Sequence, residues 1–404
     1  MSQGALDGLK VLEFGEFVSA PYCAKLMADL GADVIKVEHP ANGDESRAFG
    51  PFRGDLPDRE ASGVFAYLNA NKRGVTLDPS TRTGARLFKD LVRWADVLVE
   101  NQQPGVLETL GLTYAELGRV NEGLVMTSIS TFGRSGPYSG YKGYDLAGWH
   151  GSGIGTTHLG NPAREPLRGA WRHMDHWGAI GGAAGTMLAL YARDVVHEGQ
   201  QVDMSSAQMA AAMIMGYQTV TIYRKTGQFK VRTGGGHGQN APAGMFPCKD
   251  GFIFIFAFEM HHWHGFVKAL GEPEWAKDPL FQGAAWERAK YAHEIHTWMQ
   301  PWLDSHTKLE LFDLLQGNRV PSGPVNHAKD LMEHPHLEAR GFFSEAKHPV
   351  WGEVKAPGRP YVLSGTPWSM RGPAPLLGQH NEEVYRAMGL RREDLTDLRR
   401  AGVI

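Results

Sequence analysis

Cysteine is scarce in this sequence, and its scarcity excludes several classes of protein. Only two cysteines occur among 404 residues, Cys23 and Cys248, and they form no CxxC pair. We therefore expect neither a disulfide framework nor a cysteine zinc site. A reducing, cytoplasmic location is the expected compartment. The first residues show no basic segment followed by an apolar core, so no signal peptide is expected.

A strong excess of either charge is also missing. The 41 basic and 44 acidic residues leave a formal net charge of −3. A nucleic-acid or anionic-membrane partner would require a basic face, so neither partner is expected. The longest uncharged stretch, residues 204–223, contains serine, glutamine and threonine, and it predicts a buried helix rather than a membrane span.

Three catalytic signatures are absent. The turn after the first apolar run reads GEFVSAP rather than GxGxxG, which argues against a nicotinamide or flavin site. The segment GRSGPYSG at 133–140 lacks the GxSxG spacing of a serine hydrolase. The histidines of EMHHWHG, including His261 and His264, do not form HExxH, so no metal site is predicted.

Short apolar runs alternate with stretches of helical spacing in the first half of the chain. The runs predict buried parallel strands at 9–14, 33–38, 74–78, 96–100 and 124–130. Helices are expected between them, for example at 20–32 and 83–95. This β-α-β order predicts an α/β fold with a doubly wound, Rossmann-like large domain.

The domain boundaries follow from where this alternation stops. We expect residues 1–200 and 330–404 to form the large domain, and residues 225–325 to form a smaller α+β domain. Residues 201–224 and 326–330 are expected to be linkers.

The segment WRHMDHWGAIGGAAGTMLAL at 171–190 places Asp175 at the start of a helix of small residues. One interpretation is an N-cap, whose carboxylate accepts backbone N–H groups. The other is a catalytic carboxylate, because a helix N-terminus also stabilises a negative charge or a forming oxyanion. Glycines such as Gly181, Gly182 and Gly185 each cost roughly 1 kcal/mol relative to alanine in a helix, so something should approach that face closely.

A glycine cluster, TGGGHG, occupies residues 233–238. Successive glycines permit several backbone conformations at little steric cost, which suits a flap over a binding site. An ordinary surface loop explains the same composition.

Several longer motifs occur in one order along nearly the whole chain. They are LDGLKVLEFGEFVSAPYCAKLMADLGADVIKVEHPANGD, NANKRGVTLD, ADVLVENQQPGVLETLGL, GYDLAGWHGSGI, the Asp175 helix and APLLGQHNEEV. Together they resemble class III CoA-transferases, which include formyl-CoA:oxalate and carnitine CoA-transferases and have α-methylacyl-CoA racemases as relatives. The resemblance implies a large domain made from both chain ends, a small domain, and two interlocked subunits, as a homodimer or with a homologous partner subunit.

The resemblance also implies a reaction. Asp175 would be the nucleophile, and it would form a mixed anhydride and then an aspartyl-CoA thioester. The substrates would be an acyl-CoA and a carboxylic acid, with no tightly bound cofactor. Gly234, Gly235 and Gly236 would form a flap that excludes water.

The residues expected to contact CoA or the substrate follow from their places in these motifs. The candidate CoA contacts are Phe17, Val18, Ser19, His39, Lys72, Arg73, Asn101, Gln102, Val106 and Lys142. Lys72, Arg73 and Lys142 are alternatively solvated surface charges. Tyr144 and Asp145 are the candidate substrate contacts.

Three functions compete. Racemases of the family carry a GHD motif whose histidine is a second base, but this sequence reads GYD at Tyr144–Asp145, which favours transfer over racemisation. A non-catalytic CoA-binding scaffold is the third possibility. The basic residues around Asp175 suit an acid with a second carboxylate, such as succinyl-CoA; they are Arg168, Arg172, His173 and His176. Three tryptophans suit either a pocket for an arylalkyl acid such as benzylsuccinate or core packing; they are Trp149, Trp171 and Trp177.

Overall fold

The computed structural model describes residues 4–157, 160–215, 219–229, 231–232, 234 and 240–404. The chain divides into two compact units. Unit 1 consists of Met1–Ile154, Arg168–Thr226 and Ala339–Ile404, and unit 2 of Gly155–Leu167 and Gly227–Glu338.

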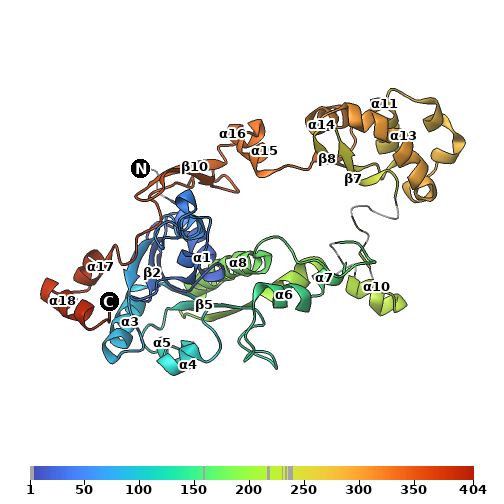
Figure 1. The fold of residues 1–404 in the computed structure, drawn as a ribbon. Coiled ribbons are helices and arrows are strands. Elements are labelled where there is room, and N and C mark those ends of the chain that lie inside the picture. The colour runs from blue at the N-terminus through green and yellow to red at the C-terminus, as the bar shows by residue number, and fades with distance from the viewer. Residues whose placement is uncertain (1–3, 158–159, 216–218, 230, 233, 235–239) are drawn as a thin grey trace. The chain divides into compact units, whose positions relative to one another are not determined.

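A six-stranded parallel sheet forms the centre of unit 1 (Figure 1). Its strands in spatial order are β3 (Arg73–Thr76), β2 (Asp33–Glu38), β1 (Lys10–Phe14), β4 (Val97–Glu100), β5 (Val125–Ser130) and β6 (Gln201–Ser205). This arrangement confirms the predicted α/β fold. The strand order reverses direction between β1 and β4, and in such sheets ligands bind at the carboxyl ends of the strands beside the reversal.

The strands are apolar because helices cover both faces of the sheet. On one face Leu12 and Leu98 pack with Phe88 of α3. On the other face Val11 and Val97 belong to a core that includes residues of α1 and α8. Strands buried on both sides have no polar face, so they appear in the sequence as continuous apolar runs.

The helices of unit 1 lie between and after these strands. They are α1 (Ser19–Asp29), α2 (Gly63–Leu68), α3 (Arg82–Trp94), α4 (Val106–Leu110), α5 (Tyr114–Leu117), α6 (Asp145–Gly151), α8 (His173–Val196), α9 (Ser206–Ala210), α10 (Thr219–Thr226), α17 (Asn381–Ala387) and α18 (Arg392–Arg400). Shorter helical turns are η1 (Glu45–Ala48), η2 (Arg53–Asp55) and η3 (Ala211–Met215), and α7 (Ile154–Thr157) spans the boundary with unit 2. An antiparallel hairpin, β10 (Phe343–His348) with β11 (Gly352–Pro357), completes the unit.

Unit 2 is built around a three-stranded antiparallel sheet and a separate apolar core. The sheet order is β7 (Ala243–Cys248), β8 (Gly251–Phe256) and β9 (Ser322–Pro324). Ile253, Trp263 and Phe266 are fully buried in this core. The helices are α11 (Met260–Ala269), α12 (Ala285–Arg288), α13 (Ala292–Ser305), α14 (Lys308–Gly317), α15 (Ala328–Met332) and α16 (Pro335–Ala339), with turns η4 (Glu274–Lys277), η5 (Pro279–Phe281) and η6 (Ala289–Tyr291).

The structure corrects the expected linkers. Residues 201–224 contain β6, which pairs in parallel with β5 because Val202 and Met204 pack against the core that includes α8. The same stretch is not one buried helix, since Met213 and Val220 are more than half exposed. Residues 326–330 run into α15 of unit 2.

Across the described residues, no helix combines the length and apolar character that crossing a bilayer requires.

Candidate active site

A cavity of about 210 Å³ lies at the carboxyl ends of β1, β4 and β5 in unit 1. The loops after these strands and the first turn of α8 form its wall. Seven residues proposed from the sequence line it, namely Phe17, Val18, Ser19, Asn101, Gln102, Tyr144 and Asp175. The sheet therefore brings together residues that are up to 158 positions apart (17 to 175), at the point where its strand order reverses.

Asn101 fixes the loop that follows β1. Its side-chain oxygen accepts a hydrogen bond from the N–H of Glu16 at 2.9 Å, and its amide donates to the Glu16 carbonyl at 2.8 Å. The same amide donates to the Ser19 hydroxyl at 2.9 Å. A Cβ on Gly15 would lie 2.9 Å from the Asn101 side-chain oxygen, so only glycine leaves room for this arrangement. Asn101 thus shapes the cavity wall in addition to lining it.

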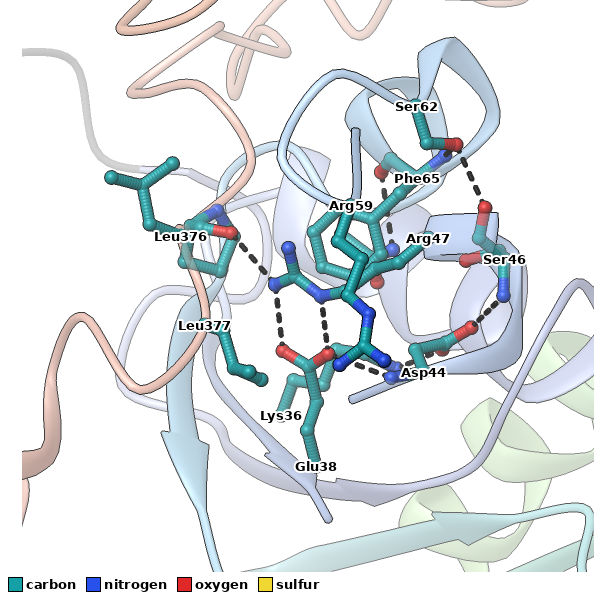
Figure 2. A network of polar contacts seen from close by, with 12 residues as sticks. Lys36, Glu38, Asp44, Ser46, Arg47, Arg59, Ser62, Phe65, Leu376 and Leu377 are labelled. Carbon is teal, nitrogen blue, oxygen red and sulfur yellow. Dashed lines mark hydrogen bonds and ion pairs between the residues drawn. The ribbon is translucent and has the colours of Figure 1, made fainter. Parts of the chain in front are cut away.

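A network of buried charges also holds this loop, and Figure 2 shows Lys36 and Asp44 of that network. Lys36 pairs with Glu13 at 2.7 Å and with Asp44 at 2.6 Å, and all three side chains are fully buried or nearly so. The other Asp44 oxygen accepts hydrogen bonds from the N–H groups of Phe17 and Ser46 at 3.0 and 2.7 Å. Although burial opposes the charged form of Lys36, the carboxylates of Asp44 and Glu13 raise its pKa, so the network is ionised.

Asp175 is the third residue of α8 rather than its N-cap. The N-cap is Arg172, in the left-handed region at φ 54°, and the simple capping interpretation of Asp175 is therefore wrong. Asp145, another predicted site residue, supplies the cap instead, because its Oδ1 accepts the N–H of Met174 at 2.8 Å. The Asp175 carboxylate is consequently not used to cap the helix. It still lies within the first turn, where the helix dipole favours negative charge.

The environment of Asp175 holds its proton affinity above that of an ordinary aspartate. Burial raises the pKa of Asp175 to about 6, Arg172 acts in the opposite direction, and the charge of Asp145 adds to the increase. Nη1 of Arg172 lies 3.5 Å from Oδ2 of Asp175. Since 22% of the Asp175 side chain is exposed toward the cavity it lines, the carboxylate is both desolvated and accessible. A carboxylate in this setting can attack an activated carbonyl carbon.

Glu16 is a cavity residue that the sequence reasoning missed. It lines this cavity and also a second one of about 180 Å³. Burial and the nearby charges of Asp44 and Glu45 raise the pKa of Glu16 to about 7. The signal that would have found it is its position, since a charged side chain directly after Gly15 at the end of a buried strand faces the ligand edge of the sheet.

Three further predicted CoA contacts lie at or beside these cavities. His39 is exposed and lines the second cavity together with Gln102. Lys142 is exposed between two residues of the first cavity wall, Tyr141 and Gly143. Val106, the first residue of α4, lines neither cavity.

Lys72 and Arg73 do not fit the expected contact with CoA phosphates. The Lys72 ammonium is fully buried, pairs with Glu13 at 2.7 Å, and donates to the Asn69 side chain at 2.8 Å. Burial lowers its pKa to about 8, although Glu13 opposes the change. Arg73 pairs with Asp33 at 2.6 Å at the amino ends of β2 and β3, on the sheet edge opposite the cavity. Both residues are therefore structural ion-pair partners, and neither faces the cavity.

The tryptophans near Asp175 divide between core and surface. Trp149 and Trp177 pack in a small apolar cluster, and the ring of His173 stacks against both of them at 5.9 and 5.8 Å. Trp171 is 52% exposed, and its ring lies 6.2 Å from that of Phe17. Trp171 is therefore the exposed ring of the three, although it lines neither of the two cavities.

The predicted flap is only partly described. Gly234 of unit 2 has a left-handed backbone with φ 71°, which glycine adopts without strain. Gly235 and Gly236 lie outside the described residues. In the part of the chain that the structure covers, no cluster of three or more histidine, cysteine, aspartate or glutamate side chains could hold a metal ion.

Comparisons with known proteins find similar chains over nearly the whole length of the sequence. The family model described as CoA-transferase family III matches residues 6–381. The chain is 33% identical to succinyl-CoA–D-citramalate CoA-transferase of Chloroflexus aurantiacus, with 99% of this chain and 98% of the relative covered. It is 34% identical to the BbsE subunit of succinyl-CoA:(R)-benzylsuccinate CoA-transferase of Thauera aromatica, with 95% and 94% covered. The crystal structure of a CAIB/BAIF family protein from Brucella suis superimposes with a TM-score of 0.85 at 28% identity, over 96% of this chain and 100% of that chain.

Proposed function

The chain belongs to CoA-transferase family III, and we propose that it moves CoA from succinyl-CoA to a second carboxylic acid through covalent intermediates on Asp175. The observation that carries the proposal is the partly exposed, desolvated Asp175 carboxylate in the cavity at the reversal of the sheet.

The chemistry proceeds by exchange of bonds to the acyl carbons. The Asp175 carboxylate attacks the thioester carbonyl of succinyl-CoA, the C–S bond breaks, and CoA leaves as a thiolate from the mixed anhydride. The thiolate then attacks the Asp175 carbonyl carbon, succinate leaves, and an aspartyl-CoA thioester remains. The acceptor acid then attacks the aspartyl-CoA thioester to give a second mixed anhydride and the thiolate, and the thiolate attacks the acceptor carbonyl to give the new acyl-CoA and free Asp175. The energy of the thioester is therefore not lost to hydrolysis.

The first turn of α8 supports these steps electrostatically. Asp175 is the third residue of the helix, where backbone N–H groups have no carbonyl partner one turn earlier. The Met174 N–H is already bound by Asp145, so in this proposal the helix dipole and the remaining N–H groups of the first turn stabilise the oxyanion that forms on each attack. A proposed CoA path follows from the cavity walls, with Phe17, Val18, Ser19 and Gln102 lining the first cavity and His39 the second.

A dicarboxylic acid is the proposed acceptor. The relatives are named for D-citramalate and (R)-benzylsuccinate, which both carry two carboxylates, and both use succinyl-CoA. Arg172 lines the same cavity and supplies a positive charge that suits such acids. An arylalkyl acid such as benzylsuccinate belongs in the proposed class because one relative is named for it, and because the half-exposed ring of Trp171 lies 6.2 Å from that of the cavity residue Phe17.

We also propose that the active form is an interlocked dimer, with a second copy or with a homologous subunit. The outer face of α8 supports this, because Leu188, Tyr191 and Val195 are each about 70% exposed. Apolar side chains on one continuous helix face mark an interface.

The racemase alternative requires a second base in the cavity, and the described residues that line the cavity include no histidine for this role. Tyr144 lines the cavity at the position where the racemase motif has histidine. His150, the nearest histidine after it, does not line the cavity. Incorporation of solvent deuterium at the α-carbon of the acyl group would favour racemisation.

The covalent mechanism is tested by trapping. After incubation with succinyl-CoA and hydroxylamine, we expect a hydroxamate at Asp175 by peptide mass spectrometry. D175N should lose on the order of 10⁴-fold or more in kcat, as expected for removal of a nucleophile. D397N is the matched control, since Asp397 is exposed on α18, lines neither cavity and should leave turnover unchanged. An unmodified Asp175 peptide from fully active enzyme would contradict the proposal.

A further inference from the structure

Arg172 has an unusual backbone conformation at the cavity and makes two close side-chain contacts there. It is a non-glycine residue in the left-handed region at the N-cap of α8. Its guanidinium carbon lies 4.1 Å above the centre of the Phe17 ring, and its Nη1 lies 3.5 Å from Oδ2 of Asp175. A strained backbone position persists only where surrounding contacts determine it, and such positions concentrate at functional sites.

The ring beneath the guanidinium is itself held rigidly. Phe17 has φ 64°, also in the left-handed region, and its N–H donates to Asp44 at 3.0 Å. Asp44 is anchored by the fully buried Lys36, as Figure 2 shows. The buried charges therefore fix the loop, the loop fixes the ring, and the ring fixes the position of the Arg172 charge beside Asp175.

The contact between Arg172 and Asp175 leaves most of the guanidinium unused. Within the described residues, Arg172 forms its ion pair with Asp175 through one nitrogen, at 3.5 Å. An arginine fork binds a carboxylate best through two parallel N–H groups at shorter distances. Because 26% of the Arg172 side chain is exposed and it lines the cavity, its other N–H groups are accessible to a ligand.

The partner of Arg172 changes charge during the reaction proposed above. When Asp175 becomes an anhydride or a thioester, its negative charge is gone, and a guanidinium in a partly buried cavity is left without a counterion. An uncompensated charge in such a place is costly, whereas a carboxylate ligand neutralises it.

We propose that Arg172 binds the reacting carboxylate of the acid substrate during the aspartyl-CoA stage, and exchanges it for Asp175 when Asp175 is released. This inference rests on the proposed function of Asp175. Arg172 first holds the leaving succinate as the C–O bond of the anhydride breaks, and then holds the acceptor in the same place. When the acceptor oxygen attacks the thioester, the C–S bond breaks and the thiolate carries the charge away. Attack of the thiolate on the acceptor carbonyl then restores the Asp175 carboxylate beside Arg172.

This exchange orders the reaction. In the resting protein one nitrogen of Arg172 is paired with Asp175, so a free acid is repelled by the like charge of the Asp175 carboxylate and competes with it for the guanidinium. After acylation the guanidinium is unpaired and the like charge is absent. The acid therefore binds the acylated enzyme in preference to the resting one.

The test isolates discharge of the covalent intermediate. Wild type, R172K and R172Q are loaded with succinyl-CoA, freed of small molecules by gel filtration, and mixed with increasing succinate while bound CoA is followed by mass spectrometry. We expect half-maximal discharge of R172Q to need roughly 10- to 100-fold more succinate, with R172K intermediate. R93Q is the matched control and should behave as wild type, because Arg93 pairs with Asp90 at the same three-residue spacing on the surface of α3.

Two further readouts separate this role from a structural one. The acidic limb of kcat/KM for succinyl-CoA should move to higher pH in R172Q, because Arg172 opposes the raised pKa of Asp175. F17L keeps every reacting group but removes the ring under the guanidinium. It should show a smaller rise in the succinate requirement, and it decides the question if R172Q cannot be loaded.

An unchanged succinate requirement in R172Q, or in F17L where R172Q does not load, overturns the role of Arg172. Absence of aspartyl-CoA in the wild type overturns the proposed function instead.

Discussion

At the scale of single residues, Phe17 and Arg172 share a backbone conformation that neither residue type favours. Their φ angles are 64° and 54°, and both side chains line the cavity. For an L-residue with a side chain this conformation costs roughly 1–2 kcal/mol. Their mutual contact and the hydrogen bond from Phe17 to Asp44 offset that cost.

Glu16 gives a prediction about stability and pH. Burial raises its pKa from 4.5 to about 7, so the folded protein favours the neutral acid. The associated stability is present in full below about pH 4.5 and is lost as the pH rises through about 7. E16Q has no charge to acquire, so its Tm relative to wild type should be roughly 2–4 °C higher at pH 8 than at pH 4.5.

Scanning calorimetry at the two pH values checks this expectation. E122Q, at an exposed glutamate, serves as the control and should show the same Tm difference at both. A Tm difference for E16Q that does not depend on pH would mean that Glu16 ionises freely in the folded protein.

The sequence predicted Asp175 and the loop residues after β1 and β4 from recognisable motifs, and the structure brings them to one cavity. Lys72 and Arg73 were misassigned since adjacent residues entering a strand point in different directions, one into the core and one to the far edge. The left-handed Arg172 could not be predicted, because its conformation depends on a ring contributed by a residue 155 positions earlier (17 to 172).

At the scale of elements, the small residues of α8 are explained by what approaches them. A Cβ on Gly178 would lie 2.2 Å from the Ser206 hydroxyl, and one on Gly182 would lie 2.8 Å from a carbon of Ile129. The helix therefore packs directly on β5 and α9. The sequence predicted a close approach to this face, and the structure confirms it with these two contacts.

G178A tests that packing. The added methyl group must displace Ser206 in a closely packed region, so we expect a loss of about 1–3 kcal/mol in the free energy of unfolding. Denaturant titration measures it, and G178A/S206A should recover part of the loss because the clashing oxygen is gone.

G317A is the matched control on α14. Apart from its chain neighbours and the backbone of its own helix, no heavy atom of the described residues lies within 4 Å of the position its Cβ would take, so the change should be neutral or stabilising by up to about 1 kcal/mol. If G178A proves as harmless as G317A, the contact between α8 and α9 is looser than described.

The strands that are buried on both faces were the easiest elements to predict. The five expected strands coincide with β1 to β5 within about two residues, since both faces of each are buried and the run is continuous. The segment 201–224 was harder because its apolar residues do not all serve one core. Val202 packs beneath α8, whereas Met213 and Val220 are exposed.

At the scale of the whole molecule, unit 1 is closed by residues from the far end of the chain. Asn381 accepts the N–H of Thr76 at 2.8 Å and donates to its hydroxyl at 2.7 Å, and the Tyr385 hydroxyl donates to the Thr76 carbonyl at 2.7 Å. His380 exchanges two hydrogen bonds with Gly74. These contacts occupy the open edge of β3, which otherwise presents unpaired backbone groups.

N381A should therefore destabilise unit 1. The Thr76 N–H is buried and would lose its acceptor, so we expect a cost of about 1–3 kcal/mol in a urea titration. E382Q alters only exposed ion pairs at the next position and should stay within about 0.5 kcal/mol of wild type. Equal stability of the two variants would show that water replaces Asn381 at no cost.

The edge contacts have a consequence for biosynthesis. Thr76 leaves the ribosome 305 residues before the asparagine that satisfies it, and all of unit 2 is translated in between. A nascent chain that has already formed β1 to β6 still exposes the edge of β3. A strand of another nascent chain on the same messenger RNA can pair with that edge. Slow translation of the last segment should therefore favour aggregation of this protein more than slow translation of unit 2 itself.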